Sequence, residues 1–157
     1  IVSGLKPYAL QFIGEESPSL IQELKMEARC CVWKSIHFPV KDQEVVDLES
    51  VLKKMNSYSG AGVDAFVLDT FDRKGMRGGT GKVFDWGIGK YLVRKIDRKV
   101  FLAGGITPYN IKEAIEEVRP YGIDLSSGVE SSVGKKDAEK LKSLMDIVRE
   151  LRKKYGS

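Results

Sequence analysis

One carboxylate stands at the end of an apolar run, because Asp69 follows Ala65 to Leu68. Side chains alternate along a β-strand, so Asp69 would share a face with Ala65 and Val67. A carboxyl at the mouth of an apolar strand is partly desolvated, which raises its pKa and suits it to general acid catalysis. An aspartate here could equally cap the next loop through its own backbone. The sequence alone leaves both interpretations open.

Two small-residue turns each follow a short apolar run near the end of the chain. Gly104 and Gly105 precede a helix-like segment, and Ser127 and Gly128 end the last run. Consecutive small residues leave backbone N–H groups accessible, and a nearby helix N-terminus favours an anion. Tight turning would explain one such turn by itself. Two of them after successive strands favour phosphate binding, so we expect all four residues to contact a phosphate group.

Two further segments give a less specific signal. The stretch Arg77 to Lys82 holds three glycines within four positions but lacks the Ser or Thr that completes a phosphate-binding P-loop. Such a loop is more often a flexible connection, and Gly79 is its candidate ligand contact. Asp124 lies in the last strand-like run, on the face opposite its apolar neighbours. We expect Asp124 to be a buried hydrogen-bonding residue near the site, with a structural role favoured over a catalytic one.

Lys34 and His37 lie in one apolar segment, Cys31 to Phe38. A strand lysine that faces the interior of the fold can form a Schiff base when its pKa is depressed, which would indicate an aldolase acting on a sugar phosphate. Pairing of Lys34 with a carboxylate inside a barrel of such strands is the interpretation that we favour. His37 is the one histidine of the chain. It has no second ligand at metal-binding spacing, so we predict no metal site.

The elements that must position these residues alternate regularly. Strand-like runs cover residues 8–12, 31–38, 63–69, 100–103 and 123–126, and a segment of helical period follows each. Helix-start signals are Ser17-Pro18 and Thr107-Pro108, and helical repeats run from Val45 to Met55, from Phe84 to Lys95 and from Leu141 to Leu151. This alternation predicts a parallel sheet with helical crossovers, which an open sheet and a closed barrel both satisfy.

Composition narrows the possible partners. The 157 residues are 42% hydrophobic and 31% charged with a net charge of +4, which is typical of one globular domain. Basic and acidic residues are interspersed, so no nucleic-acid surface is predicted. Cys30 and Cys31 are adjacent and would point to opposite faces of a strand, so we predict no disulfide between them. We recognise no secretory or membrane-spanning segment and expect a cytoplasmic protein without a membrane partner.

Five longer blocks follow one another through nearly the whole chain. They are LQFIGEE (Leu10 to Glu16), VLDT (Val67 to Thr70), GGTGKVFDW (Gly78 to Trp86), FLAGGITPYNI (Phe101 to Ile111) and YGIDLSSGVESSVGKKD (Tyr121 to Asp137). In order and spacing they resemble the phosphoribosylanthranilate isomerases of tryptophan biosynthesis, and the last three blocks are highly specific.

The resemblance implies a parallel (β/α)8 TIM barrel and a cofactor-free Amadori rearrangement. The substrate would be N-(5-phosphoribosyl)anthranilate, and the product 1-(2-carboxyphenylamino)-1-deoxyribulose 5-phosphate. Asp69 would act as the general acid on the ring oxygen, and the turns at Gly104-Gly105 and Ser127-Gly128 would hold the phosphate. Gln11 would lie near the anthranilate, where this chain has Ile13 in place of the usual histidine of the family.

The resemblance also implies that the chain starts just before the fourth barrel strand. Residues 1–157 would then be the C-terminal part of a single TIM-barrel domain, an incomplete barrel of five β/α units lacking the first three. The general base of the family, a first-strand cysteine, would be absent, and neither Cys30 nor Cys31 replaces it. We therefore expect a phosphorylated substrate, an N-terminal half from the same or a separate chain, and little activity of this chain alone. A Schiff-base aldolase using Lys34 and a non-catalytic half-barrel assembly module are the alternatives.

Overall fold

The sheet that positions the candidate residues has five parallel strands in sequence order. The computed structural model describes residues 2–71 and 82–155. Its strands are β1 (Ala9–Phe12), β2 (Cys31–Pro39), β3 (Ala65–Phe71), β4 (Lys99–Leu102) and β5 (Gly122–Ile123). Each is hydrogen-bonded in parallel to the next. Helical crossovers between sequential strands produce this order, so the predicted parallel β/α fold is confirmed.

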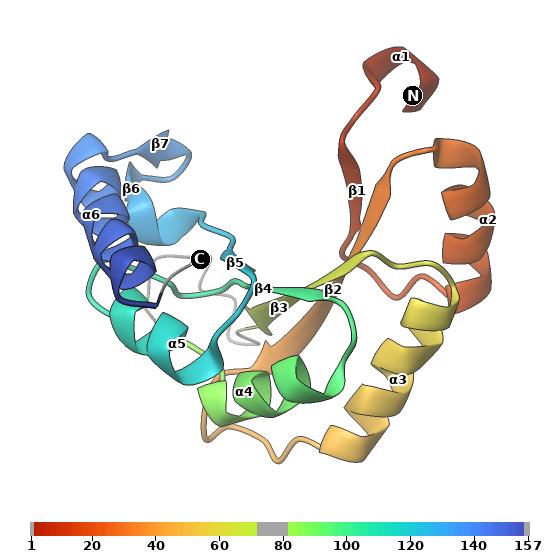
Figure 1. Ribbon diagram of the computed structural model, residues 1–157, viewed down its shortest axis with the longest axis horizontal. Coiled ribbons are helices and arrows are strands. Elements are labelled where there is room, and N and C mark those ends of the chain that lie inside the picture. Colours follow the sequence, from red (N-terminus) through yellow and green to blue (C-terminus); the bar gives the residue numbers. More distant parts are fainter. Residues whose placement is uncertain (1, 72–81, 156–157) are drawn as a thin grey trace.

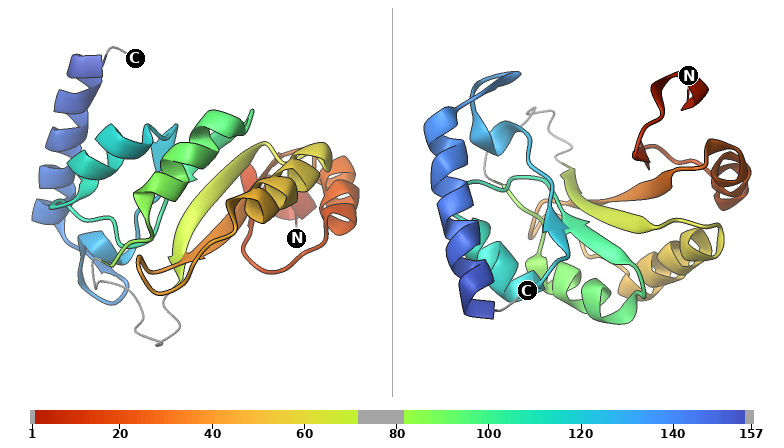
Figure 2. Two further views of the ribbon diagram at one scale, coloured as in Figure 1. Left: turned by 90° about the horizontal axis from the view of Figure 1, so that it is seen from below. Right: turned by 45° about the horizontal axis from the view of Figure 1, so that its top comes forward.

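Helices cover one side of the curved sheet (Figure 1; Figure 2). Within the described residues they are α2 (Pro18–Ala28), α3 (Leu48–Gly60), α4 (Trp86–Lys95), α5 (Ile111–Val118) and α6 (Ala138–Tyr155). A short helix, α1 (Val2–Leu5), precedes β1. The 3₁₀ turn η1 (Ser127–Val129) and the hairpin of β6 (Glu130–Ser132) and β7 (Lys135–Lys136) lie between β5 and α6. Among the described residues, none of these five longer helices lies over the concave side of the sheet (Figure 1; Figure 2).

Alternation along the strands divides the sheet into two faces. Side chains at Val32, Ile36 and Phe38 of β2 are buried in the core that the helices complete. On β3, Phe66 and Leu68 belong to the same core. The intervening residues of both strands must therefore face the concave side, because successive side chains point to opposite faces. This parity decides which polar residues reach the open face.

Side-chain caps explain where several helices begin. The Ser17 hydroxyl accepts a hydrogen bond from Leu20 N, and Pro18 is the first residue of α2, as the sequence predicts. The start predicted at Thr107-Pro108 is wrong, because α5 begins at Ile111. The side chain of Asn110 accepts from Thr107 N at 2.8 Å and donates to Gly105 O at 2.9 Å. These two bonds hold the preceding residues in a turn instead of a helix.

Other boundaries also differ from the sequence prediction. Val45 lies before α3 and is fully exposed, and Phe84 precedes α4 although it is buried in the core. The last strand is only two residues long before the chain turns into η1. Among the described residues, no helix is both long enough and apolar enough to cross a membrane.

Candidate active site

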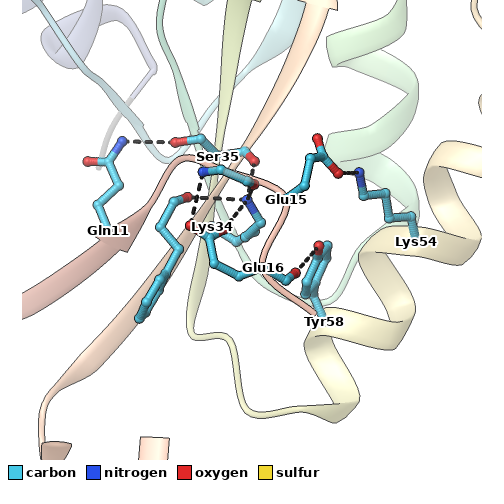
Figure 3. Close-up of polar contacts among 9 residues, drawn as sticks. Gln11, Glu15, Glu16, Lys34, Ser35, Lys54 and Tyr58 are labelled. Carbon is cyan, nitrogen blue, oxygen red and sulfur yellow. Dashed lines mark hydrogen bonds and ion pairs between the residues drawn. The ribbon is translucent and has the colours of Figure 1, made fainter. Parts of the chain in front are cut away.

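Polar side chains gather on the concave face where the strands end. Ser35 and His37 alternate with the helix-facing residues of β2, and Asp69 lies beside His37 because the two are register partners between β2 and β3. Gln11 comes from β1, and its Nε2 donates to Ser35 Oγ at 3.0 Å (Figure 3). An amide, a hydroxyl, an imidazole and a carboxylate from β1, β2 and β3 thus lie on the concave face toward the carboxyl ends of the strands. We call this edge of the concave face the rim.

The two oxygens of Asp69 have different surroundings. Oδ1 accepts a hydrogen bond from Thr70 N at 2.7 Å, and Oδ2 lies 3.9 Å from His37 Nε2. Burial raises the pKa of the Asp69 carboxyl, and the negative charge of Asp124 raises it further, while the Thr70 amide and His37 lower it. The residue therefore caps its own strand end and also has the raised pKa that general acid work requires. The hydrogen bond from Thr70 N agrees with the capping interpretation, and the role of Asp69 as a general acid stays a prediction.

The first glycine turn is pressed against Asp69. Gly104 has φ +75°, and a Cβ at this position would overlap Thr70 N and lie 2.5 Å from Asp69 Oδ1. Gly105 has φ +68°, and a Cβ there would overlap the carbonyl oxygen of Lys82. Any other residue at either position would need both a left-handed backbone and space that neighbouring backbone already fills. The turn thus brings main chain next to the carboxylate.

The second turn lies against the first. A Cβ at Gly128 would overlap the carbonyl oxygen of Ile106, and Val129 of the same turn is buried. Beyond this turn, Lys136 Nζ donates to Ser126 O at 2.9 Å and pairs with Glu130 at 2.8 Å. The hairpin therefore holds the turn in place. The structure brings Asp69, the Gly104-Gly105 turn and the Ser127-Gly128 turn into one continuous group.

The sequence also predicted roles for Asp124 and Gly79, and the structure describes only the first of these residues. Asp124 continues the pairing of β5, with its N–H donating to Leu102 O at 2.9 Å. Its side chain is exposed, so the prediction of a buried residue is wrong: β5 is an edge of the sheet among the described residues, and no further strand lies beside it there. Asp124 is nevertheless close enough to raise the pKa of Asp69. Gly79 lies outside the described residues.

Lys34 faces away from the rim, which contradicts the Schiff-base alternative. It shares the helix-facing side of β2 with Val32 and Ile36 and is 1% exposed. Its Nζ donates to the carbonyl oxygens of Gly14 at 2.7 Å and Ser35 at 3.1 Å, and it lies 3.2 Å from a Glu16 carboxylate oxygen (Figure 3). An amine held in this way is not free, and it lies on the helix side of the sheet and not on the concave side. The favoured pairing with a carboxylate is confirmed, but its predicted place inside a barrel is wrong, because Lys34 lies on the helix-covered side of the sheet with Val32 and Ile36.

His37 is the residue whose position sequence reasoning missed. The sequence marks it only as a lone histidine without metal-ligand partners, and the described residues contain no group of three or more His, Cys, Asp or Glu able to hold a metal ion. The signal for its true neighbour is the strand register, which pairs His37 with Asp69. Placing both residues at their strand ends and counting alternation would have suggested the contact.

Comparison with known proteins agrees with this architecture. In fold, the chain belongs with the β/α-barrel type of domain, and its candidate site lies where such domains carry theirs, at the carboxyl ends of parallel strands. The solved phosphoribosyl anthranilate isomerase from Thermus thermophilus matches 96% of this chain with a TM-score of 0.71 and 30% identity. A structure of such an isomerase in complex with reduced 1-(o-carboxyphenylamino)-1-deoxyribulose 5-phosphate matches 95% of the chain with a TM-score of 0.69 and 28% identity.

Sequence relatives lead to the same family. The family model described as N-(5'-phosphoribosyl)anthranilate (PRA) isomerase matches residues 1–147. The N-(5'-phosphoribosyl)anthranilate isomerases of Caldanaerobacter subterraneus subsp. tengcongensis and Acetivibrio thermocellus are 43% and 38% identical to this chain, over 95% and 90% of its length. The chain therefore belongs to the N-(5'-phosphoribosyl)anthranilate isomerase family. It spans 64% and 61% of the lengths of these two relatives.

Proposed function

We propose that this chain supplies the general acid and the phosphate-binding turns of an isomerase of tryptophan biosynthesis. The reaction is the Amadori rearrangement of N-(5-phosphoribosyl)anthranilate to 1-(2-carboxyphenylamino)-1-deoxyribulose 5-phosphate. The observation that carries the proposal is the contact of Asp69 with the Gly104 turn, which in turn abuts Gly128. Family membership and the bound product analogue of a relative support the same substrate.

In the proposed mechanism, backbone amides at Gly104, Gly105, Ser127 and Gly128 hold the phosphate. This anchors the ribose ring above Asp69, which donates a proton to the ring oxygen as the C–O bond opens. Ring opening leaves an iminium at C1′, and a general base then removes the proton from C2′. The resulting enaminol takes up a proton at C1′, which gives the ketone at C2′. The rearrangement moves protons within one substrate and transfers no electrons to a second molecule, so acid and base groups are sufficient and no cofactor is required.

The two ends of the substrate reach different parts of the rim. With the phosphate at the β4 and β5 ends, the anthranilate group extends toward β1 and β2, where Gln11 lies. We assign Gln11 to this end of the substrate. Asp124 acts on Asp69 by favouring its protonated form, as the raised pKa of Asp69 indicates. Gly79 stays a proposed ligand contact, on the strength of the family motif alone.

The five strands are proposed to be a segment of an eight-stranded barrel, with residues 1–157 forming part of one domain. Among the described residues β1 and β5 are the two edges of the sheet. Three more β/α units, on the same or a separate chain, would close it. The match to 65% of the Thermus thermophilus chain supports this arrangement.

The general base is proposed to come from those units. Cys30 and Cys31 lie at the other end of β2, and Cys31 precedes His37 by six positions along the extended strand, or about 20 Å. Neither thiol can reach a substrate at the rim. The isolated chain should therefore bind the substrate but turn it over very slowly.

The test is complementation. The purified chain would be mixed with a polypeptide comprising the first three β/α units of the Caldanaerobacter relative, and product formation measured with and without Asp69→Asn. We expect turnover only in the mixture, with a loss of at least ~100-fold in the variant. A mixture that assembles but never produces product would favour the non-catalytic assembly module. Turnover that survives Asp69→Asn would refute the assignment of the acid. Turnover by the isolated chain that disappears in His37→Gln would identify His37 as a base.

A further inference from the structure

Lys34 is a buried cation that binds the segment following β1. Besides Gly14 O and Ser35 O, its Nζ contacts Phe12 O at 3.4 Å. Lys34 is 1% exposed, and its Nζ lies 5.5 Å from the ring centroid of Tyr58 on α3. An ammonium group at this depth is tolerated only when its charge and donors are matched. Two of the matching carbonyls belong to the strand end and loop that follow Gln11.

The same loop is tied to the helix layer at Glu16. One carboxylate oxygen of Glu16 accepts from Gly14 N at 3.0 Å, and the other lies 3.2 Å from Lys34 Nζ. The Tyr58 hydroxyl donates to Glu16 O at 2.7 Å. Burial would raise the pKa of Glu16, but hydrogen bonds from its own amide, Lys34 and Gly14 hold it below the ordinary value. The loop therefore carries a fixed negative charge against the buried ammonium.

The concave side holds the same strand end through the next residue of β2. Ser35 accepts the hydrogen bond from Gln11 Nε2, and its carbonyl oxygen accepts from Lys34 (Figure 3). Gln11 is thus fixed twice. Its main chain pairs with β2, and the carbonyl groups of Phe12 and Gly14, which follow it, bind Lys34. Its side-chain amide donates to Ser35. Ile13, in the loop that follows β1, is 66% exposed.

We propose that Lys34 is a positioning residue for the anthranilate end of the substrate, acting through Gln11. It fixes the residues after β1 from the helix side while Ser35 fixes the Gln11 amide from the rim side. The phosphate turns lie at the ends of β4 and β5 and share none of these contacts. Loss of Lys34 therefore weakens recognition of the aryl end and leaves phosphate recognition intact. This inference rests on the proposed function for the identity of the ligand, but the positioning of Gln11 does not depend on it.

The test compares Lys34→Met with Lys54→Met. Methionine fills the buried space without the charge, a replacement that buried ion pairs often tolerate. Lys54 pairs with Glu15 of the same loop at 2.9 Å, but this pair is exposed, so its removal controls for a lost charge beside the loop. Calorimetry would measure binding of reduced 1-(o-carboxyphenylamino)-1-deoxyribulose 5-phosphate and of inorganic phosphate. NMR would follow the Gln11 side-chain amide and hydrogen exchange at Gly14 N.

We expect Lys34→Met to weaken the analogue by about tenfold or more, with phosphate binding within about twofold of the original, because misplaced binding groups lose affinity without a change in anion contacts. The Gln11 amide signals should shift and Gly14 N should exchange faster, whereas Lys54→Met changes none of these. If Lys34→Met does not fold, Ser35→Ala must show the same selective loss.

Equal weakening of both ligands, or unchanged Gln11 signals in folded Lys34→Met, would overturn the proposal. If the original chain fails to bind the analogue at all, the proposed function fails. The NMR comparison then still decides whether Lys34 positions Gln11.

Discussion

At the scale of single residues, Asp69 is set between groups that push its pKa in opposite directions. Burial and Asp124 favour the protonated form, and the Thr70 amide and His37 favour the ionised form. Two of these four influences come from other side chains, His37 on β2 and Asp124 next to β5. Either side chain can be substituted without changing Asp69 itself. Substitution of one of these neighbours should therefore raise the pKa of Asp69, and substitution of the other should lower it.

His37→Gln and Asp124→Asn should move the pKa of Asp69 in opposite directions. Removing the imidazole removes an influence that lowers the pKa, so His37→Gln should raise it; removing the Asp124 charge should lower it. Carboxyl-carbon NMR titration of Asp69 would measure both. If the pKa of Asp69 moved in the same direction in both variants, His37, which lies 3.9 Å from Asp69, and Asp124 would not be the groups that set it.

Asp69→Asn should stabilise the fold near neutral pH and not in strong acid. Because the pKa of Asp69 is higher in the folded chain than in an unfolded one, ionisation costs folding free energy. That cost is absent below the unfolded pKa of about 3.9 and develops as the pH rises through the folded pKa. The side chain is 37% exposed, so solvent screening keeps the effect small. Thermal melts at about pH 7 and about pH 2.5 would measure it; a lower Tm for the variant at the higher pH would contradict the account.

The sequence predicted the position of Asp69 well and the neighbours of Lys34 and His37 poorly. A polar residue closing an apolar strand is a local signal, and it was enough to place Asp69 at the rim. Which face Lys34 occupies depends on the burial of Val32 and Ile36, which no single window of the sequence determines. The contact of His37 with Asp69 depends on register between strands 32 residues apart, and register is a property of the assembled sheet.

At the scale of elements, strands were easier to predict than the segments between them. Apolar runs located the first four strands of the main sheet to within two residues at each end, whereas the last run, predicted over residues 123–126, shares only Ile123 with β5. The start of α5 was misplaced because Asn110 bonds back to the turn, and this competes with the helix-start signal at Thr107-Pro108. The β6–β7 hairpin was not predicted, since its residues are mostly exposed and have no apolar pattern.

Gly128→Ala tests the contact between the two turns. An added Cβ would overlap the Ile106 carbonyl oxygen, a backbone atom that cannot move without displacing the Gly104-Gly105 turn. We expect a loss of about 1–3 kcal/mol in folding free energy together with loss of phosphate binding. Gly60→Ala is the matched control, because a Cβ at that helical position meets no atom within 4 Å and alanine favours helix. Denaturant unfolding and phosphate titration of both variants would measure the difference, and wild-type behaviour of Gly128→Ala would disprove the contact.

At the scale of the whole molecule, the sheet has a helix-covered side and an open side. Below the rim the open side is aromatic: Trp33 and Phe101 stack with ring centroids 4.6 Å apart, and Tyr121 meets Phe101 edge-on. Among the described residues, none of these three side chains is fully buried, in contrast to the core on the helix side. A closed barrel would cover them with its remaining strands. The rim itself needs none of those strands to bring Asp69 and the two turns together.

The central claim is that this rim binds a phosphorylated sugar derivative through the two turns. An NMR titration of the chain with reduced 1-(o-carboxyphenylamino)-1-deoxyribulose 5-phosphate, followed at every backbone amide, tests it most directly. We predict saturable shifts that are largest at Gly104, Gly105, Ser127 and Gly128, and that persist in Asp69→Asn. Shifts confined to the helix side or to the β6–β7 hairpin, or no saturable shift at all, would contradict the account.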